Sequence, residues 1–247
     1  MIDVMKSRVL VIGAGVIGLS CAARLAEAGH EVHVLARDLP LETTSATAAA
    51  LWYPFHAFPA DRVNAWALAS YDEFTRLAAE EPDSGVRRVW GPEYLRPPSA
   101  DPPAWSTQLP RFEPPVRLPQ GYADGWRFPA PVVDMSVYLP WLRTRLEELG
   151  VTVTRQALPG LPGIAPVVVD ASGLGARHLA GDDGVRPVSG QIVVVEQFGL
   201  REWVLAQHSD DPADSELVYI VPRLHEVVVG GTARADDWHL SPSPDVA

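Results

Sequence analysis

The chain is poor in cysteine and in positive charge, and it has no long uninterrupted hydrophobic run. One cysteine, Cys21, among 247 residues excludes an intramolecular disulfide and a zinc site built from several cysteines. Lys and Arg number 20 against 31 Asp and Glu, so neither nucleic acid nor an anionic membrane is expected as a partner. The chain contains no run of about 18 apolar residues, so no transmembrane helix is predicted. With no signal-peptide features at the start, we expect a soluble, cytoplasmic protein.

The first 40 residues carry the clearest local signal. Residues 8–12 form a β-branched run typical of a buried strand, and Gly13, Gly15 and Gly18 follow as a G-x-G-x-x-G motif. An Ala- and Leu-rich stretch at 19–28 predicts a helix ended by Gly29, and residues 31–35 alternate like a second strand. This order of strand, glycine loop, helix and strand indicates a dinucleotide-binding site.

Each glycine of the motif has an expected task. The first allows a tight turn, the second lets the backbone approach a pyrophosphate, and the third lets the helix lie close to the strand. The motif alone does not separate NAD, NADP and FAD. An acid usually ends the second strand, but here that place is Ala36, followed by Arg37 and Asp38. Since Arg37 suits an NADP phosphate, an NADP-binding reductase or regulator is one alternative.

The middle of the chain predicts a helix and then a proline-rich region. A helical stripe over residues 61–81, ending before Pro82, is expected to pack on a sheet; its members are Val63, Trp66, Ala67, Ser70, Tyr71, Phe74, Leu77 and Ala78. Residues 82–131 hold 12 of the 24 prolines, a density that excludes long helices and central strands. Interspersed aromatic residues argue against disorder, so we expect short edge strands and ordered loops. A helix ending at residue 149 should follow.

Five segments stand out in chain order, namely Val11–Ser20 with Leu35–Pro40, Thr43–Phe55, Val167–Ala176, Arg186–Ile192, and Tyr219–Arg223 followed by Val229–Thr232, Asp237 and Trp238. Together they resemble the D-amino-acid oxidase family, flavoproteins of the glutathione-reductase-like FAD fold. The resemblance implies an α/β protein with a Rossmann-like FAD-binding lobe and an α+β substrate lobe that contains a mixed or antiparallel sheet. Residues 1–57 and 134–180 would form the FAD lobe, and residues 58–133 and 181–247 the substrate lobe.

The resemblance also implies an FAD site spread along the chain. The glycine motif would bind the pyrophosphate, Arg37 would lie by the adenosine ribose, and Ser172 and Gly173 would line the adenine side, with Leu158 a further adenine contact. Backbone N–H groups of residues 50–52 would face the flavin ring, and Tyr219 would bind the substrate carboxylate. The complete set of expected cofactor residues is Gly13, Ala14, Gly15, Val16, Ile17, Gly18, Ala36, Arg37, Asp38, Thr43, Thr44, Ser45, Ala49, Ala50, Leu51, Trp52, Leu158, Ser172 and Gly173.

The implied reaction is oxidation of a D-amino acid by FAD and dioxygen. It gives an imino acid, then a 2-oxo acid and ammonia, with hydrogen peroxide as the second product. No general base is required if the amine binds deprotonated, and no other catalytic motif is present in the sequence. The expected partners are a small D-amino acid and O2, and a homodimer is compatible with the sequence. Oxidation of glycine or D-aspartate on the same fold is the alternative within the class, and no metal is expected.

Two further expectations concern the later part of the chain. The acidic segment 207–217, between two strands, is expected to be a solvated loop or, by the resemblance, an active-site lid. Ser243, Pro244 and Asp245 form a helix-start signal with no helix after it. The family continues here with a substrate-binding arginine and a last FAD segment. We therefore expect a truncated oxidase, with FAD or NADP binding but no activity as a third alternative.

Overall fold

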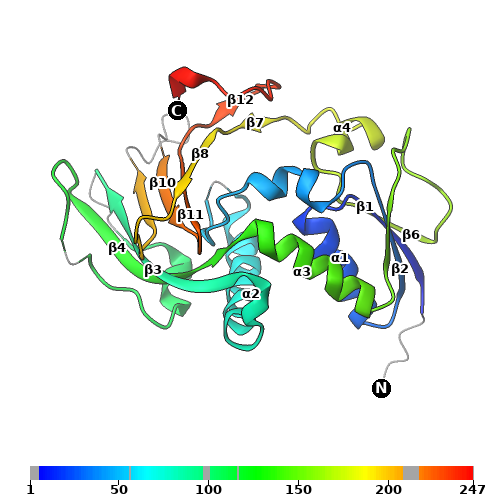
Figure 1. Ribbon diagram of the computed structural model, residues 1–247, viewed down its shortest axis with the longest axis horizontal. Helices are drawn as coiled ribbons and strands as arrows, with labels where there is room; N and C mark the ends of the chain where they lie inside the picture. The colour runs from blue at the N-terminus through cyan, green and yellow to red at the C-terminus, as the bar shows by residue number, and fades with distance from the viewer. Residues whose placement is uncertain (1–5, 56, 97–100, 116, 208–216, 247) are drawn as a thin grey trace. The chain divides into compact units, whose positions relative to one another are not determined.

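The computed structural model describes residues 6–55, 57–96, 101–115, 117–207 and 217–246. The chain divides into two compact units, Met1–Ala48 with Met135–Pro187, and Ala49–Asp134 with Val188–Ala247 (Figure 1). The expected lobes had boundaries after residues 57, 133 and 180, whereas the units have them after 48, 134 and 187. Which unit binds which ligand stays a prediction. No helix in the described ranges combines the length and apolar character needed to cross a membrane.

The first unit is built on a four-stranded parallel sheet in the order β5-β2-β1-β6. Its strands are β1 (Arg8–Ile12), β2 (Glu31–Ala36), β5 (Thr152–Arg155) and β6 (Val167–Asp170). Its helices are α1 (Val16–Glu27), α3 (Met135–Glu148) and α4 (Ala176–Leu179), with short 3-10 turns η1 (Pro40–Glu42), η2 (Thr44–Thr47) and η5 (Gly173–Gly175). The sheet and the crossover helices confirm the predicted Rossmann-like class.

Both faces of this sheet are packed. Side chains alternate along β1, so Leu10 and Ile12 point away from Val9 and Val11. Leu10 and Ile12 form a buried cluster that includes partly buried Leu158. Helices α1 and α3 pack against each other (Figure 1). The glycines predicted to end these helices do so, at φ +89° for Gly29 and +75° for Gly150.

The second unit is built on a six-stranded mixed sheet in the order β4-β3-β9-β10-β11-β8, beside a two-stranded β12-β7 pair. Its strands are β3 (Val86–Leu95), β4 (Asp124–Val133), β7 (Val188–Ser189), β8 (Ile192–Glu196), β9 (Val204–Gln207), β10 (Leu217–Pro222), β11 (Glu226–Gly230) and β12 (Arg234–Ala235). Its helix is α2 (Ala60–Glu80), and its 3-10 turns are η3 (Pro82–Ser84), η4 (Ala104–Gln108) and η6 (Pro244–Val246).

The expectation of only short edge strands in residues 82–131 is wrong. Both β3 and β4 have ten residues and pair along their full length, and β3 lies inside the sheet. These prolines lie where a missing backbone N–H removes few hydrogen bonds of the sheet. Pro129 and Pro131 lie on the outermost strand β4, and β9 pairs with β3 only from Glu93 onward, beyond Pro92. Proline density therefore misled because a missing N–H matters only where a partner strand needs it.

Helix α2 confirms the predicted amphipathic segment, but its apolar stripe is narrower than expected. Tyr71 and Leu77 are buried, whereas the Trp66 side chain is 56% exposed. The guanidinium of Arg62 lies 4.8 Å from the centre of the Trp66 ring. This cation–π contact accommodates an exposed tryptophan on the outer face of the helix.

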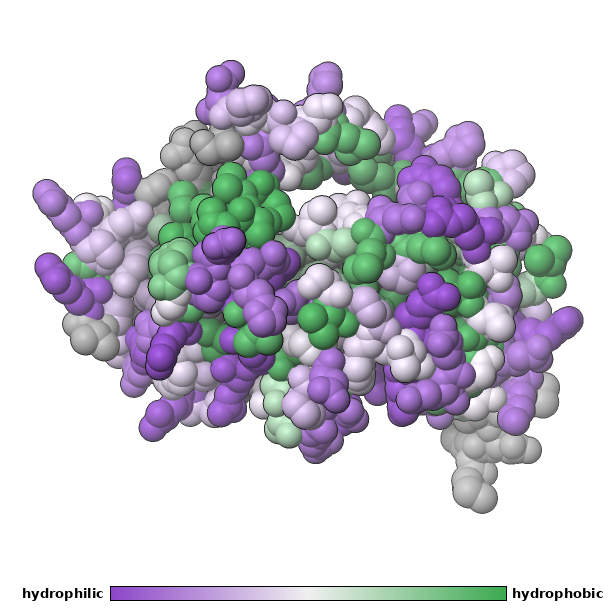
Figure 2. Space-filling model, viewed as in Figure 1, coloured by the Kyte–Doolittle hydropathy of each residue, from purple (hydrophilic) through white to green (hydrophobic). Residues whose placement is uncertain are grey.

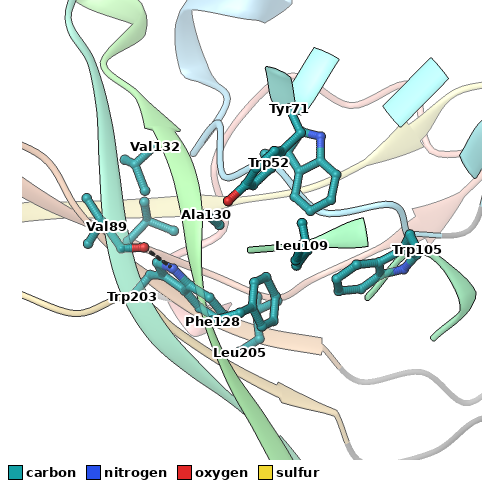
Figure 3. Close-up of a cluster of buried hydrophobic side chains, with 11 residues drawn as sticks. Trp52, Tyr71, Val89, Trp105, Leu109, Phe128, Ala130, Val132, Trp203 and Leu205 are labelled. Atoms are coloured by element: carbon teal, nitrogen blue, oxygen red, sulfur yellow. Dashed lines mark hydrogen bonds between the residues drawn. The ribbon is translucent and has the colours of Figure 1, made fainter. Parts of the chain in front are cut away.

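An aromatic cluster forms the core of the second unit (Figure 3). Its buried members are Trp52, Tyr71, Val89, Trp105, Leu109, Phe128, Ala130, Val132, Trp203, Leu205 and Val221. Phe128 and Trp203 are fully buried, with ring centres 4.8 Å apart in an edge-to-face arrangement. The Trp203 indole N–H donates to the Val89 carbonyl at 2.8 Å. Trp105 packs edge-on against Trp52, with ring centres 5.5 Å apart. These large rings bury apolar area, and the indole N–H groups of Trp203 and Trp52 both donate to backbone carbonyls, so the cluster stabilises the β3–β4 side of the sheet.

The cover over the mixed sheet is uneven. Val221, Val228 and Val194 are directly opposite one another on β10, β11 and β8. The first two are fully buried, whereas Val194 on the outermost strand is 48% exposed. In the space-filling view, hydrophobic residues gather over these strands (Figure 2). Among the described residues, the aromatic cluster thus covers the β3–β4 side of the sheet and leaves Val194 on β8 about half exposed.

Candidate functional site

The glycine loop lies at the carboxyl end of β1, with β2 on one side and β6 on the other. Ligands bind at this kind of position in open α/β sheets. The Gly13 N–H donates to the Leu35 carbonyl, and the Ala171 N–H donates to the Ile12 carbonyl, both at 2.8 Å. The fold thereby brings three separate sets of expected cofactor residues to one sheet edge, namely residues 13–18, 36–38 and 172–173.

Two glycines of the motif are fixed by close backbone packing. Gly13 has φ +111°, and a Cβ there would lie 2.3 Å from the Ala171 carbonyl oxygen. A Cβ on Gly18 would lie 1.9 Å from the Gly13 carbonyl oxygen. Any side chain at either position forces the turn or the helix to move. These are the tight turn and the close helix approach that the spacing predicts.

Gly15 and the start of α1 form an open cradle. Gly15 is the N-cap, with no side-chain cap, and the first turn of α1 carries no acidic residue. The Val16 N–H donates to Ser45 Oγ at 3.0 Å, and a Cβ on Gly15 would lie 3.0 Å from that hydroxyl oxygen and 3.8 Å from Thr43 Oγ1. Gly15 without a side chain, the nearby Ser45 hydroxyl and the positive end of a 12-residue helix suit a pyrophosphate, so this cradle fits FAD.

The other residues of this segment take local roles. The Thr43 hydroxyl donates to the Pro40 carbonyl at 2.7 Å, and the Thr44 carbonyl accepts from the Thr47 hydroxyl at 3.0 Å. Ala14 is buried, whereas Ile17 is 65% exposed. These two bonds stabilise the turns of the hydroxyl segment 43–47, while the Val16 N–H bond to Ser45 Oγ connects the segment to the start of α1. Its ligand contacts stay a prediction.

Arg37 and Asp38 follow β2 and pair with each other. The guanidinium donates to the Asp38 carboxylate at 2.6 Å, which lowers the pKa of Asp38 and raises that of Arg37. The Arg37 side chain is nevertheless 76% exposed. Ala36, the place where an acid is usual, is buried in the strand end. An exposed cation at this edge suits the sugar–phosphate part of a nucleotide.

The β6 side of the edge holds Ser172 and Gly173. Ser172 donates its hydroxyl to Asp170 Oδ1 at 2.6 Å and its N–H to the same oxygen at 3.1 Å. Gly173 follows in the left-handed conformation at φ +59°. Leu158 packs against the Leu10 cluster of the sheet core. The turn is therefore preorganised by its own aspartate, while adenine contact by these residues stays a prediction.

Residues 49–52, which contain the expected flavin-ring residues 50–52, lie in the second unit along the outer edge of β4. Leu51 forms a bridge with Val132, and the Val133 N–H donates to the Ala50 carbonyl at 2.9 Å. Ala50 has φ +54°, which is unusual for a residue with a side chain. The Trp52 N–H donates to the Pro131 carbonyl at 2.9 Å. Because the Ala50 carbonyl and the Trp52 N–H are already bonded to β4, we expect any flavin contact of this segment to come from its remaining backbone groups.

Tyr219, the expected substrate residue, lies on β10 between Leu205 of β9 and Gly230 of β11. Its ring lies over Gly230, where a Cβ would come within 2.3 Å of the phenol oxygen. Burial raises the pKa of Tyr219, so its hydroxyl stays protonated at neutral pH and can donate a hydrogen bond. The predicted lid falls largely on residues 208–216, which lie outside the described residues.

Sequence reasoning missed Glu93 and Tyr53. Glu93 is a carboxyl with 2% exposure on β3, and it accepts a hydrogen bond from the Tyr53 hydroxyl at 2.5 Å. An acid at a core-facing position of an alternating strand is the signal that could have found it. It went unseen because the proline content argued against a central strand there.

Comparison with known proteins gives a consistent result. The model of the family of FAD-dependent oxidoreductases (DAO) matches residues 8–247. A D-amino-acid oxidase of Rubrobacter xylanophilus is 42% identical over 98% of this chain and 74% of its own length. One from Streptomyces coelicolor is 40% identical over 99% and 76%. The crystal structure of glycine oxidase from Geobacillus kaustophilus matches with a TM-score of 0.74 at 19% identity, covering 98% of this chain and 75% of that one. The predicted resemblance is confirmed.

Proposed function

The chain belongs to the family of FAD-dependent oxidoreductases, and we propose that it oxidises D-amino acids with dioxygen. The products are an imino acid, which water converts to a 2-oxo acid and ammonia, and hydrogen peroxide. The observation that carries this proposal is the identity of 42% and 40% to two D-amino-acid oxidases over nearly the whole chain. The phosphate cradle between β1 and α1 supports the dinucleotide cofactor that this reaction requires.

The residues of the first unit divide the cofactor between them in this proposal. The start of α1, with Ser45 and Thr43, binds the pyrophosphate, and Arg37 lies by the adenosine. Ser172 and Gly173 line the adenine side. In the second unit, residues 50–52 contact the flavin ring. A family that depends on FAD favours this assignment over the NADP alternative.

The chain's own contribution to the chemistry is orientation. Bound FAD would supply the acceptor for the hydride that leaves the substrate Cα. Tyr219 donates its phenol hydrogen to the substrate carboxylate, and burial keeps that hydrogen in place across the neutral range. Fixing the carboxylate restricts the direction of the Cα–H bond, and well-oriented reactants gain much of their rate in this way.

The visible absorption spectrum of the purified protein, recorded before and after anaerobic addition of D-alanine, tests the function. We expect flavin bands that bleach with D-alanine and persist with L-alanine. Glycine and D-aspartate, added in parallel, identify the alternative substrates by faster bleaching. Bands that persist with every amino acid tried would overturn the oxidase assignment. A colourless protein that does not take up added FAD would overturn the cofactor assignment as well.

A further inference from the structure

One row of residues crosses the mixed sheet of the second unit. Pairing registers place Trp126, Glu93, Leu205, Tyr219 and Gly230 directly opposite one another on five adjacent strands. Directly opposite residues point to the same face of a sheet. Glu93 and Tyr219 are therefore on one face, two strands or about 10 Å apart. It is the face that carries the aromatic cluster, because Leu205 belongs to that cluster.

The Glu93 carboxyl is bound to a residue far away in the sequence. It is 2% exposed, and burying a carboxyl group is costly unless hydrogen bonds compensate. The Tyr53 hydroxyl donates to it at 2.5 Å. Tyr53 directly follows Trp52, and its ring packs edge-on against Trp105 with ring centres 5.7 Å apart. The bond joins the end of the expected flavin segment to the interior of the sheet.

This bond reaches further than the other ties of that segment. The bonds from Trp52 N–H to Pro131 and from Val133 N–H to Ala50 connect the segment to β4, the outermost strand. The Trp52 indole N–H donates to the Ala67 carbonyl of α2 at 2.8 Å. Glu93 lies on β3, one strand deeper, in the row that carries Tyr219. The Tyr53–Glu93 bond therefore links residues 49–52 to that row through the adjacent Tyr53.

We propose that Glu93 is a positioning residue: through Tyr53 it fixes residues 49–52 with respect to the sheet row that carries Tyr219. The inference rests on the proposed function, in which this segment contacts the flavin ring and Tyr219 contacts the substrate carboxylate. Neither Glu93 nor Tyr53 takes part in the chemistry. Their bond determines how accurately the two contacting groups are placed, and small misplacements are costly in rate.

The test compares two tyrosine-to-phenylalanine changes in the same aromatic cluster. Tyr53→Phe removes only the hydroxyl that donates a hydrogen bond to the Glu93 carboxylate. The control is Tyr71→Phe, which removes the hydroxyl that donates to the Pro129 carbonyl at 3.0 Å. For Tyr53→Phe we expect a shifted visible flavin spectrum, a kcat with D-alanine reduced about 10- to 100-fold, and a KM changed less than about threefold. For Tyr71→Phe we expect an unshifted spectrum and an unchanged kcat.

Glu93→Gln is the conservative variant, because the amide oxygen of the new side chain still accepts a hydrogen bond from the Tyr53 hydroxyl. We expect its spectrum to match that of the parent protein and its kcat to stay within about threefold. An unshifted spectrum with normal kcat in Tyr53→Phe would overturn the inference, even if the variant melts at a lower temperature. If the parent protein binds FAD but oxidises no amino acid, the proposed function fails, and the spectral comparison alone still decides the positioning role.

Discussion

The two units place their expected site residues by different physical means. In the first, the backbone determines the geometry: three neighbouring strands end at one edge, and Gly13 and Gly18 leave no room for a Cβ. In the second, side-chain packing and pairing determine it. Tyr219 lies over Gly230, and Tyr53 reaches across β4 to a buried carboxyl.

This difference decides which substitutions each site tolerates. A site determined by backbone approach depends on the absence of side chains, so an added methyl group is the most damaging change. A site determined by packing depends mainly on the presence of particular side chains, so truncations are its characteristic damaging changes, although Tyr219 also needs Gly230 to carry no side chain. Changes of both kinds therefore separate the two units, and all of them except the change at Tyr219 have a matched control elsewhere in the chain.

The largest effect is expected for Gly18→Val. Its Cβ would lie 1.9 Å from the Gly13 carbonyl oxygen, so the turn and α1 cannot keep their places. We expect a protein that does not retain FAD through purification, measured by the flavin absorption per protein. Gly29→Ala is the control. A Cβ there would have no atom within 4 Å, so the only strain comes from the backbone φ of +89°. It should cost about 1 kcal/mol of unfolding free energy and keep FAD. Normal FAD content in Gly18→Val would refute the backbone argument.

The second effect concerns the aromatic core. Trp203→Ala removes a fully buried ring and leaves the Val89 carbonyl without its 2.8 Å donor. We expect a loss of about 3–5 kcal/mol of unfolding free energy, measured by urea denaturation followed by circular dichroism. The same change at Trp66, which is 56% exposed, should alter stability by less than about 1 kcal/mol. Equal losses in the two variants would contradict the burial that separates them.

The third effect is on substrate binding. Tyr219→Phe removes a hydrogen bond to a charged group, worth about 1.5–3 kcal/mol, so KM for D-alanine should rise about 10- to 100-fold. FAD content should not change. Because burial raises the pKa of Tyr219, the phenol ionises only above its ordinary value of about 10. The ratio of the KM of Tyr219→Phe to the KM of the parent protein should stay constant up to about pH 10 and decrease above it. A ratio that falls already near neutral pH would exclude a donated phenol hydrogen.

Much of the first unit could be predicted from the sequence because local rules determine it. Strands at 8–12 and 31–36, the turn at Gly13 and the helix ends at Gly29 and Gly150 each follow from a few adjacent residues. Bringing Ser172 and Arg37 to the same edge then needs only the parallel order of the strands. The expected cofactor residues of this unit accordingly lie together.

The second unit could be predicted less well, since its elements depend on partners far away in the sequence. Pro92 is compatible with an interior strand only because β9 begins pairing after it, at Glu93. Trp66 fits the helical stripe but stacks with Arg62 at the surface. The Tyr53–Glu93 bond joins residues 40 positions apart, which no local pattern reveals.

The smallest effect separates ligand binding from structure at the edge of the first unit. Arg37→Ala breaks an exposed pair with Asp38, and such pairs contribute about 0–1 kcal/mol, so the melting temperature should hardly move. If Arg37 also contacts the adenosine part of FAD, the dissociation constant of FAD should rise about 3- to 10-fold. Arg155→Ala is the matched control, because Arg155 pairs with Glu42 at the same 2.6 Å distance on neighbouring β5. Fluorescence titration of the apoprotein with FAD measures both constants. Identical FAD dissociation constants for the two variants would mean that Arg37 is a surface residue without a cofactor contact. The cradle at this edge would then consist of the glycine loop and the hydroxyls of segment 43–47.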